Sequence, residues 1–194
     1  MIFIVTSTEI CSDNFLTRME KIAMARPDRV IFKEENMPEK EYRTLAYDCQ
    51  AICRLYDVDF SVNSHISIAK EVHSDIHLSL PELKKQPEIV KQFRTVGVSV
   101  RNKEEAEEAQ QLGASYIIAE NICSAADGET PNGFEFLQNI VFAVSIPVLA
   151  SGGITKERTA YVYANGASGV CSVSHFMECN MDEIENDIFY FKNT

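Results

Sequence analysis

Short apolar runs recur along the whole chain, and an amphipathic stretch follows each of them. Runs rich in β-branched and aromatic residues predict eight strands, at residues 2–5, 29–32, 60–62, 76–78, 96–98, 116–119, 148–150 and 169–172. The stretches between them have helical spacing. Residues 102–112, for example, begin with the potential cap Asn102 and acidic residues and are followed by Gly113. Strands and helices therefore alternate throughout the chain.

This alternation predicts an α/β protein with a parallel sheet. Eight units of about 24 residues would form a small (β/α)8 TIM barrel, as one domain spanning residues 1–194. A doubly wound open sheet of about six or seven strands is the alternative. Polar residues at the carboxyl ends of the strands favour the barrel, because there these ends converge on one mouth. They are Thr6, Ser7, residues 33–35, Asn63, Ser79, Ser99, Glu120, Asn121, Ser151, Ser172 and Ser174.

Acidic residues outnumber basic ones: 29 Asp and Glu against 18 Lys and Arg give a net charge of −11. Such a surface repels nucleic acid and anionic membranes, so neither is an expected partner. The apolar runs are strand-sized and the first residues lack the basic start of a signal peptide, so we expect a cytoplasmic protein. The six cysteines form no C-x-x-C pair and are expected to be reduced core residues rather than a zinc site. Nothing in the sequence indicates an oligomeric state.

Two neighbouring turns at the predicted mouth suit an anion. Ser151, Gly152 and Gly153 lie between the seventh strand and a helix that opens near Thr155. Glycine lets a ligand approach the backbone, and the helix start offers unpaired N–H groups. A Gly-Gly pair alone would indicate only a tight turn, but Ser172, Val173 and Ser174 after the eighth strand add further donors, and barrels often bind phosphate between these two loops. No Walker or dinucleotide motif is present to indicate ATP or NAD.

Several short motifs occur in a characteristic order. They are residues 76–78 (Ile-His-Leu) after Asn63, residues 97–99 (Gly-Val-Ser), residues 113–116 (Gly-Ala-Ser-Tyr), residues 146–154 (Ile-Pro-Val-Leu-Ala-Ser-Gly-Gly-Ile) and residues 166–170 (Gly-Ala-Ser-Gly-Val). With them, the chain resembles the thiamine phosphate synthase and TenI family of phosphate-binding barrels. In the synthase, a hydroxymethylpyrimidine pyrophosphate loses pyrophosphate, and the nitrogen of a thiazole phosphate captures the pyrimidine cation. Such chemistry requires Mg²⁺ and basic side chains around the leaving group.

The resemblance implies a role for each matching residue. Lys33 and Asn63 would bind the pyrimidine pyrophosphate, Ser99 would contact its pyrophosphate, and Glu82 would bind Mg²⁺. The thiazole phosphate would lie on the turns at residues 151–153 and 172–174.

The chain departs from the family after four of its strands. After the second, the family's Gln, Arg and Lys are matched by Ile31, Lys33 and Glu35, so that Glu35 reverses a charge. After the third, Ser64 and His65 stand where the family has Asp and Arg, and after the fourth Glu82 stands for an Asp. Residues 123–130, after the sixth, contain no lysine, and Thr130 is the nearest match to the family's Thr-x-Thr-Lys.

Other activities stay open. A TenI-like tautomerase moves protons on a thiazole carboxylate phosphate. At its histidine position this chain has Asn121, beside which Glu120 would act as base. A catalytically silent protein that binds thiazole phosphate is a further alternative, and an unrelated sugar-phosphate isomerase or epimerase is a more distant one. His77 either forms hydrogen bonds in the core or faces the mouth, and the pattern does not choose between them.

Overall fold

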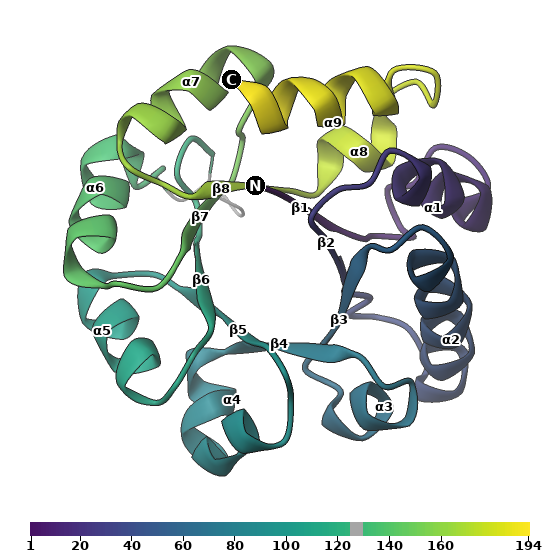
Figure 1. The fold of residues 1–194 in the computed structure, drawn as a ribbon, viewed down its shortest axis with the longest axis horizontal. Helices are drawn as coiled ribbons and strands as arrows, with labels where there is room; N and C mark the ends of the chain where they lie inside the picture. The colour runs from purple at the N-terminus through teal and green to yellow at the C-terminus, as the bar shows by residue number, and fades with distance from the viewer. Residues whose placement is uncertain (125–129) are drawn as a thin grey trace.

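The structure, a computed structural model, describes residues 1–124 and 130–194. Eight parallel strands pair in sequence order, and β1 also pairs with β8, so that the barrel is closed. Figure 1 shows the strands as an inner ring with the helices outside it. The (β/α)8 barrel is confirmed, and the open-sheet alternative is wrong. The strands are β1 (Ile2–Val5), β2 (Arg29–Phe32), β3 (Asp59–Asn63), β4 (Asp75–Ser79), β5 (Val96–Val100), β6 (Tyr116–Ala119), β7 (Val148–Ser151) and β8 (Gly169–Ser172).

Helices follow the strands and cover the barrel (Figure 1). They are α1 (Phe15–Met24), α2 (Glu39–Leu55), α3 (Ile66–Glu71), α4 (Leu80–Lys85), a 3₁₀ helix (Pro87–Lys91), α5 (Lys103–Gln111), α6 (Gly133–Ala143), α7 (Lys156–Ala164), α8 (Ser174–Glu178) and α9 (Ile184–Asn193). Asn102 caps α5 as predicted, since its side chain accepts a hydrogen bond of 2.8 Å from the Glu105 N–H. Gly113, with φ of 95°, ends it.

All eight predicted strands are present, four of them with the predicted bounds. The other four are longer than predicted because polar residues continue the hydrogen-bonded ladder. Asp59 and Asp75 begin β3 and β4, and their backbones pair with the neighbouring strands although aspartate is unfavourable in strands. The apolar pattern alone therefore gives the buried part of each strand and misses its polar ends.

Alternate strand residues divide the core into two parts. The larger part lies between the strands and the helices and contains Cys49 and Cys53, both fully buried, as expected for core thiols. The smaller part fills the barrel interior, where the rings of Phe3 and Tyr116 meet edge to face with centroids 5.0 Å apart. The interior is thus a packed core, and any ligand must bind above it, at the mouth.

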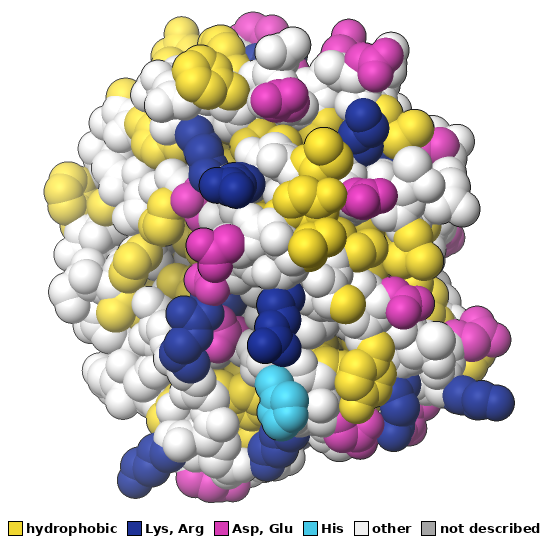
Figure 2. All heavy atoms as spheres, turned by 45° about the vertical axis from the view of Figure 1, so that its right-hand side comes forward, with side chains coloured by type: hydrophobic (Ala, Val, Ile, Leu, Met, Phe, Trp, Pro, Cys, Tyr) yellow, Lys and Arg dark blue, Asp and Glu magenta, His cyan; other side chains and the backbone are white. Residues whose placement is uncertain are grey.

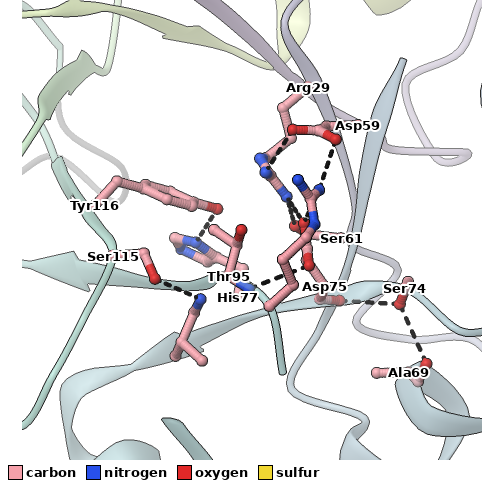
Figure 3. Close-up of polar contacts among 12 residues, drawn as sticks. Arg29, Asp59, Ser61, Ala69, Ser74, Asp75, His77, Thr95, Ser115 and Tyr116 are labelled. Atoms are coloured by element: carbon pink, nitrogen blue, oxygen red, sulfur yellow. Dashed lines mark hydrogen bonds and ion pairs between the residues drawn. The ribbon is translucent and has the colours of Figure 1, made fainter. Parts of the chain in front are cut away.

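A charged network closes the amino-terminal end of the barrel (Figure 3). Arg29 is buried and donates to Asp75 at 2.8 Å, to Asp59 at 3.0 Å and to the Ser61 hydroxyl at 2.7 Å. Arg94, from the loop before β5, donates to the same two carboxylates. Because Arg29 and Asp75 are each only 5% exposed, the pair depends on its mutual neutralisation.

The outer surface carries both signs of charge. On the face shown in Figure 2, Lys and Arg side chains lie among Asp and Glu side chains, with apolar side chains between them. Among the helices of the described residues, none is both long enough and apolar enough to span a membrane.

The amino-terminal network gives a stability prediction. Asp75→Asn removes the buried partner of Arg29 and should lower the free energy of unfolding by about 3 kcal/mol. Asp59→Asn is the matched control: its side chain is 43% exposed, so its loss should cost less than about 1 kcal/mol. Urea unfolding of the two variants measures both values. Equal losses would show that burial does not set the strength of this network.

Candidate active site

Among the described residues, Lys33 lines four cavities at the carboxyl ends of the strands, and three of them exceed about 500 Å³. The β6–β8 cavity, of about 710 Å³, holds residues 151–153 and 172–174 together with Glu120 and Asn121. The β3–β5 cavity, of about 540 Å³, holds Asn63, Glu82, Ser99 and again Glu120. The β1–β2 cavity, of about 520 Å³, lies on the other side of Lys33. The predicted site residues therefore gather at one mouth, in two adjoining cavities.

The two glycines of the β7 turn have the backbone that only glycine adopts easily. The φ angles are 95° at Gly152 and 64° at Gly153. A Cβ atom on Gly152 would lie 2.6 Å from the Ser124 carbonyl oxygen and 2.8 Å from the Asn121 Cα. The loop after β6 is also bonded to this turn, since the Cys123 N–H donates to the Gly152 carbonyl at 2.8 Å. Close packing of the β6 loop, and not only a ligand, thus requires glycine here.

Helix α7 begins just after this turn, with Thr155 as its cap in extended conformation. The turn therefore faces the positive end of a nine-residue helix. Arg158, in the first turn of α7, donates from Nη1 to the Gly153 carbonyl at 2.9 Å and places a second positive charge beside the turn. Sequence reasoning missed Arg158. Its position, five residues after Gly153 in the first turn of α7, lets its side chain reach back to the Gly153 carbonyl.

A buried carboxylate ties the two predicted phosphate turns together. Asp187 of α9 accepts from Lys156, the first residue of α7, and from His175 Nε2, in α8, at 2.6 Å. The hydrogen bond with Asp187 raises the pKa of Lys156. His175, Asp187 and Cys179 also place three possible metal ligands within 4.8 Å. Because Lys156 already occupies the carboxylate, we interpret the cluster as an ion-pair network that positions α7 and α8.

Lys33 forms an ion pair with Glu35, with 2.8 Å between Nζ and Oε1. The hydrogen bond from Lys33, and then its charge, lower the pKa of Glu35. The two side chains are 42% and 70% exposed. The acidic residue that departs from the family pattern is thus the ion-pair partner of the lysine, in a pair that solvent weakens.

Glu82 is held by its own helix start. Its Oε2 accepts from both the N–H and the hydroxyl of Ser79, each at 2.7 Å. Burial opposes ionisation, but these hydrogen bonds and one from Ser64 outweigh it and lower the pKa of Glu82. Glu82 is therefore a fixed anion at the edge of the β3–β5 cavity, while Asn63 beside it donates to the Ser64 hydroxyl at 3.0 Å.

Arg101 is a second cation that sequence reasoning missed. It follows β5 directly and lines both the β6–β8 and the β3–β5 cavity. Its Nε lies 3.5 Å from Glu120 Oε2, and its side chain is 76% exposed. Lys85 also reaches the β3–β5 cavity. Together with Lys33, these residues give the mouth more positive charge than the sequence comparison with the family motif indicated.

His77 lies on the floor of the β3–β5 cavity and belongs to the core. It is 4% exposed, with Nδ1 3.1 Å from the Tyr116 hydroxyl and Nε2 3.1 Å from the Ser99 hydroxyl. Burial, assisted by the charges of Lys33 and Arg29, lowers its pKa to about 3. Of the two interpretations of His77 that the sequence left open, the structure supports the hydrogen-bonded core histidine, which stays neutral at physiological pH.

Comparison with known proteins shows the family of this chain. Residues 2–176 match the family model described as thiamine monophosphate synthase. The chain belongs to the thiamine monophosphate synthase family. A thiamine-phosphate synthase from Fusobacterium nucleatum is 35% identical over 89% of this chain and 87% of its own length. A putative thiamine-phosphate synthase 2 from Aquifex aeolicus is 32% identical over 91% and 97%. The thiamine phosphate pyrophosphorylase structure from Pyrococcus furiosus has a TM-score of 0.82 at 22% identity, covering 98% of this chain and 93% of that one.

One of the places at which the sequence departs from the family pattern lies partly outside the described residues. The lysine-free segment at residues 123–130 includes residues 125–129, which lie outside the described residues. Its described start, Cys123 and Ser124, packs on the Gly152 turn, so the segment begins at the rim of the β6–β8 cavity.

The β7 turn of this synthase-family barrel gives a second prediction. Gly152→Ala adds both a strained φ and a clash with the β6 loop, and should lower the free energy of unfolding by about 3 kcal/mol or more. Gly133→Ala is the matched control, because Gly133 has φ of 79° but no atom within 4 Å of an added Cβ. Its cost should be about 1–2 kcal/mol, from the strained φ alone. Thermal unfolding measures both, and equal losses would contradict the close packing at Gly152.

Proposed function

We propose that this protein is a thiamine-phosphate synthase, which joins hydroxymethylpyrimidine pyrophosphate to thiazole phosphate with release of pyrophosphate. The observation that carries the proposal is the pair of adjoining cavities, which share Lys33, Arg101 and Glu120. Each cavity suits one anionic substrate, and the shared wall would place the two reacting groups together. The family relationship supports the same substrates.

The thiazole phosphate would bind in the β6–β8 cavity. Backbone N–H groups of Gly152 and Gly153, the start of α7, and the hydroxyls of Ser172 and Ser174 are all available on the cavity wall. A phosphate there would also lie near the charge of Arg158, which is anchored on the Gly153 carbonyl. Donors fixed by the backbone lose little freedom when the ligand arrives, which favours tight binding.

The pyrimidine pyrophosphate would bind in the β3–β5 cavity. Lys33, Lys85 and Arg101 supply positive charge there, and Asn63 and Ser99 supply neutral donors. Lys33 would exchange Glu35 for the pyrophosphate, and Arg101 would exchange Glu120. The protein as a whole is acidic, so this local gathering of cations is what would hold a polyanion.

The donor set also fits Mg²⁺. This ion commonly binds proteins through one or two carboxylates and completes its coordination with water and substrate phosphates. Glu82 is ionised, has Oε2 engaged by Ser79, and lines the β3–β5 cavity. Glu82 would therefore hold the ion. When bound, Mg²⁺ would neutralise charge on the departing pyrophosphate.

The reaction breaks the bond between the pyrimidine methylene carbon and the pyrophosphate oxygen, and the electron pair leaves with the pyrophosphate. The thiazole nitrogen then donates its electron pair to this carbon and becomes the cationic nitrogen of thiamine phosphate. Residues at the wall shared by the two cavities would align the nitrogen with the carbon. Lys33 and Arg101 would stabilise the charge that grows on the pyrophosphate in the transition state. We expect this reaction to take place in the cytoplasm.

The synthase proposal is tested with hydroxymethylpyrimidine pyrophosphate, thiazole phosphate and Mg²⁺, by measuring thiamine phosphate as fluorescent thiochrome. Lys33→Gln, Arg101→Gln and Glu82→Gln should each lower kcat/KM by about 10²-fold, because Lys33 and Arg101 would balance the charge of the leaving group directly and Glu82 would hold the ion that does so. Lys40→Gln and Glu104→Gln, on exposed helix positions, are the matched controls and should leave kcat/KM unchanged. If the wild-type protein binds thiazole phosphate and forms no thiamine phosphate, the assignment fails, and a silent binding protein or a TenI-like tautomerase acting through Glu120 takes its place.

Asp187 gives a separate prediction for the thiazole phosphate. Asp187→Asn loosens Lys156 and His175, which it holds at the starts of α7 and α8, and should raise KM for thiazole phosphate about tenfold. KM for the pyrimidine pyrophosphate should not change, because the β3–β5 cavity contains none of these groups. Steady-state kinetics with each substrate varied in turn measures the two constants. An equal rise in both would mean that Asp187 supports the barrel generally and does not position the phosphate turns.

A further inference from the structure

A chain of hydrogen-bonded side chains runs through the barrel interior toward the mouth. The Tyr116 hydroxyl lies 3.1 Å from His77 Nδ1, and His77 Nε2 lies 3.1 Å from Ser99 Oγ. The Arg29 guanidinium of the amino-terminal network lies over the other end, 5.5 Å from the centroid of the Tyr116 ring. Figure 3 shows the contact between Tyr116 and His77, with Arg29 on the same side of the barrel.

Burial fixes the direction of the bonds in this chain. Tyr116 is 4% exposed, and among the described residues its hydroxyl has one hydrogen-bond partner, His77 Nδ1. A hydroxyl hydrogen that is buried without an acceptor is costly, so the Tyr116 hydrogen must lie in this bond.

Tyr116 therefore donates its hydrogen to His77 Nδ1. A neutral imidazole carries one hydrogen, so with Nδ1 as acceptor the hydrogen is on Nε2. Nε2–H then donates to Ser99 Oγ. The Ser99 oxygen is occupied by this bond, and its hydrogen is left to point toward the β3–β5 cavity, which Ser99 lines.

Gly97 gives independent support for this hydrogen-bonded series of side chains. Gly97 lies on β5 between Tyr116 of β6 and His77 of β4. A Cβ atom there would be 2.0 Å from Tyr116 Cζ, 2.2 Å from its hydroxyl oxygen and 2.5 Å from His77 Nδ1. The contact between the two rings therefore exists only because β5 has no side chain at this point.

We propose that Tyr116 and His77 act as positioning residues that fix the Ser99 hydroxyl as a hydrogen-bond donor to an anionic oxygen in the β3–β5 cavity. The anion is a pyrophosphate group, which rests on the proposed function. Because buried His77 stays neutral, Ser99 keeps this role over the whole physiological pH range. A hydroxyl fixed as donor recognises an oxygen that only accepts, such as a phosphate oxygen, and disfavours a substrate hydroxyl that must donate.

The first test reads the position of the His77 hydrogen by ¹⁵N NMR of the histidine side chains in the unliganded protein. The wild-type protein should show the Nε2–H form of His77 from pH 6 to pH 8. Tyr116→Phe keeps the ring and removes the hydroxyl, so the signal should change toward the Nδ1–H form or a mixture. Tyr163→Phe is the matched control, because its hydroxyl bonds to the Phe191 carbonyl and not to a histidine. An Nδ1–H signal in the wild-type protein would overturn the proposal.

The second test measures binding of inorganic pyrophosphate with Mg²⁺ by calorimetry, which does not require turnover. Tyr116→Phe and Ser99→Ala should each weaken binding about tenfold, the loss expected for one hydrogen bond to a charged group. The double variant should be no weaker than Ser99→Ala alone, because Tyr116 acts through Ser99. Unchanged affinity in Tyr116→Phe, additive losses, or no pyrophosphate binding by the wild-type protein would each overturn the proposal. Thiamine phosphate formation by the same wild-type preparation shows whether the proposed function fails with it.

Discussion

Pairing of β1 with β8 is the constraint on which the site depends. The register joins Ile2 to Val170 and Ile4 to Ser172, so the last strand of the chain ends beside the first. With strands of only four or five residues, closure brings every carboxyl end to one small mouth. Turns that are distant in sequence become neighbours there, and Lys33 of the β2 loop lines the same cavity as Gly152 and Ser174.

Electrostatic pairing organises this mouth in the unliganded protein. Lys33 is paired with Glu35, Arg101 with Glu120 and Lys156 with Asp187. The first two pairs are exposed and weak, so on the proposed function an anionic substrate would displace the carboxylate at little cost. The third is different, because Asp187 is buried and holds its lysine in place. Exchangeable pairs thus suit substrate binding, and the buried pair suits the positioning of α7 and α8.

Much of the fold follows from local sequence, because each strand carries its own apolar run and some turns, such as those at Gly113 and Gly152, carry a glycine. That the predicted phosphate turns at Gly152 and Ser174 lie at the mouth was also predictable, since a turn and the helix after it are adjacent in sequence. The positions of Asp187, Tyr116 and Arg29 relative to the mouth were not, because their partners lie on other strands or helices. Arg101 is intermediate: it follows β5 two residues after Ser99, and a continued strand register would have placed it at the mouth.

Sequence reasoning has the same limit at Gly152 and Gly97, the two glycines closest to the proposed site. Local reasoning assigned Gly152 to ligand approach, and the structure adds the packing of the β6 loop against it. The motif at Gly97 gave no reason for the glycine. Only the neighbouring strands show that it makes room for the contact between Tyr116 and His77. A glycine that is required for its positive φ can be inferred from the sequence of one turn. A glycine that is required because a Cβ would clash can be recognised only when the neighbouring strands are known.

The most direct test of two adjoining anion sites is a crystal structure of the protein with thiamine phosphate, pyrophosphate and Mg²⁺. The phosphate of thiamine phosphate should lie on Gly152, Gly153 and Ser174. The pyrophosphate should lie beside Lys33, Arg101 and Ser99, within reach of Glu82. A pyrophosphate bound away from the β3–β5 cavity, or a thiamine phosphate bound away from the two turns, would contradict the division of the mouth into two substrate sites.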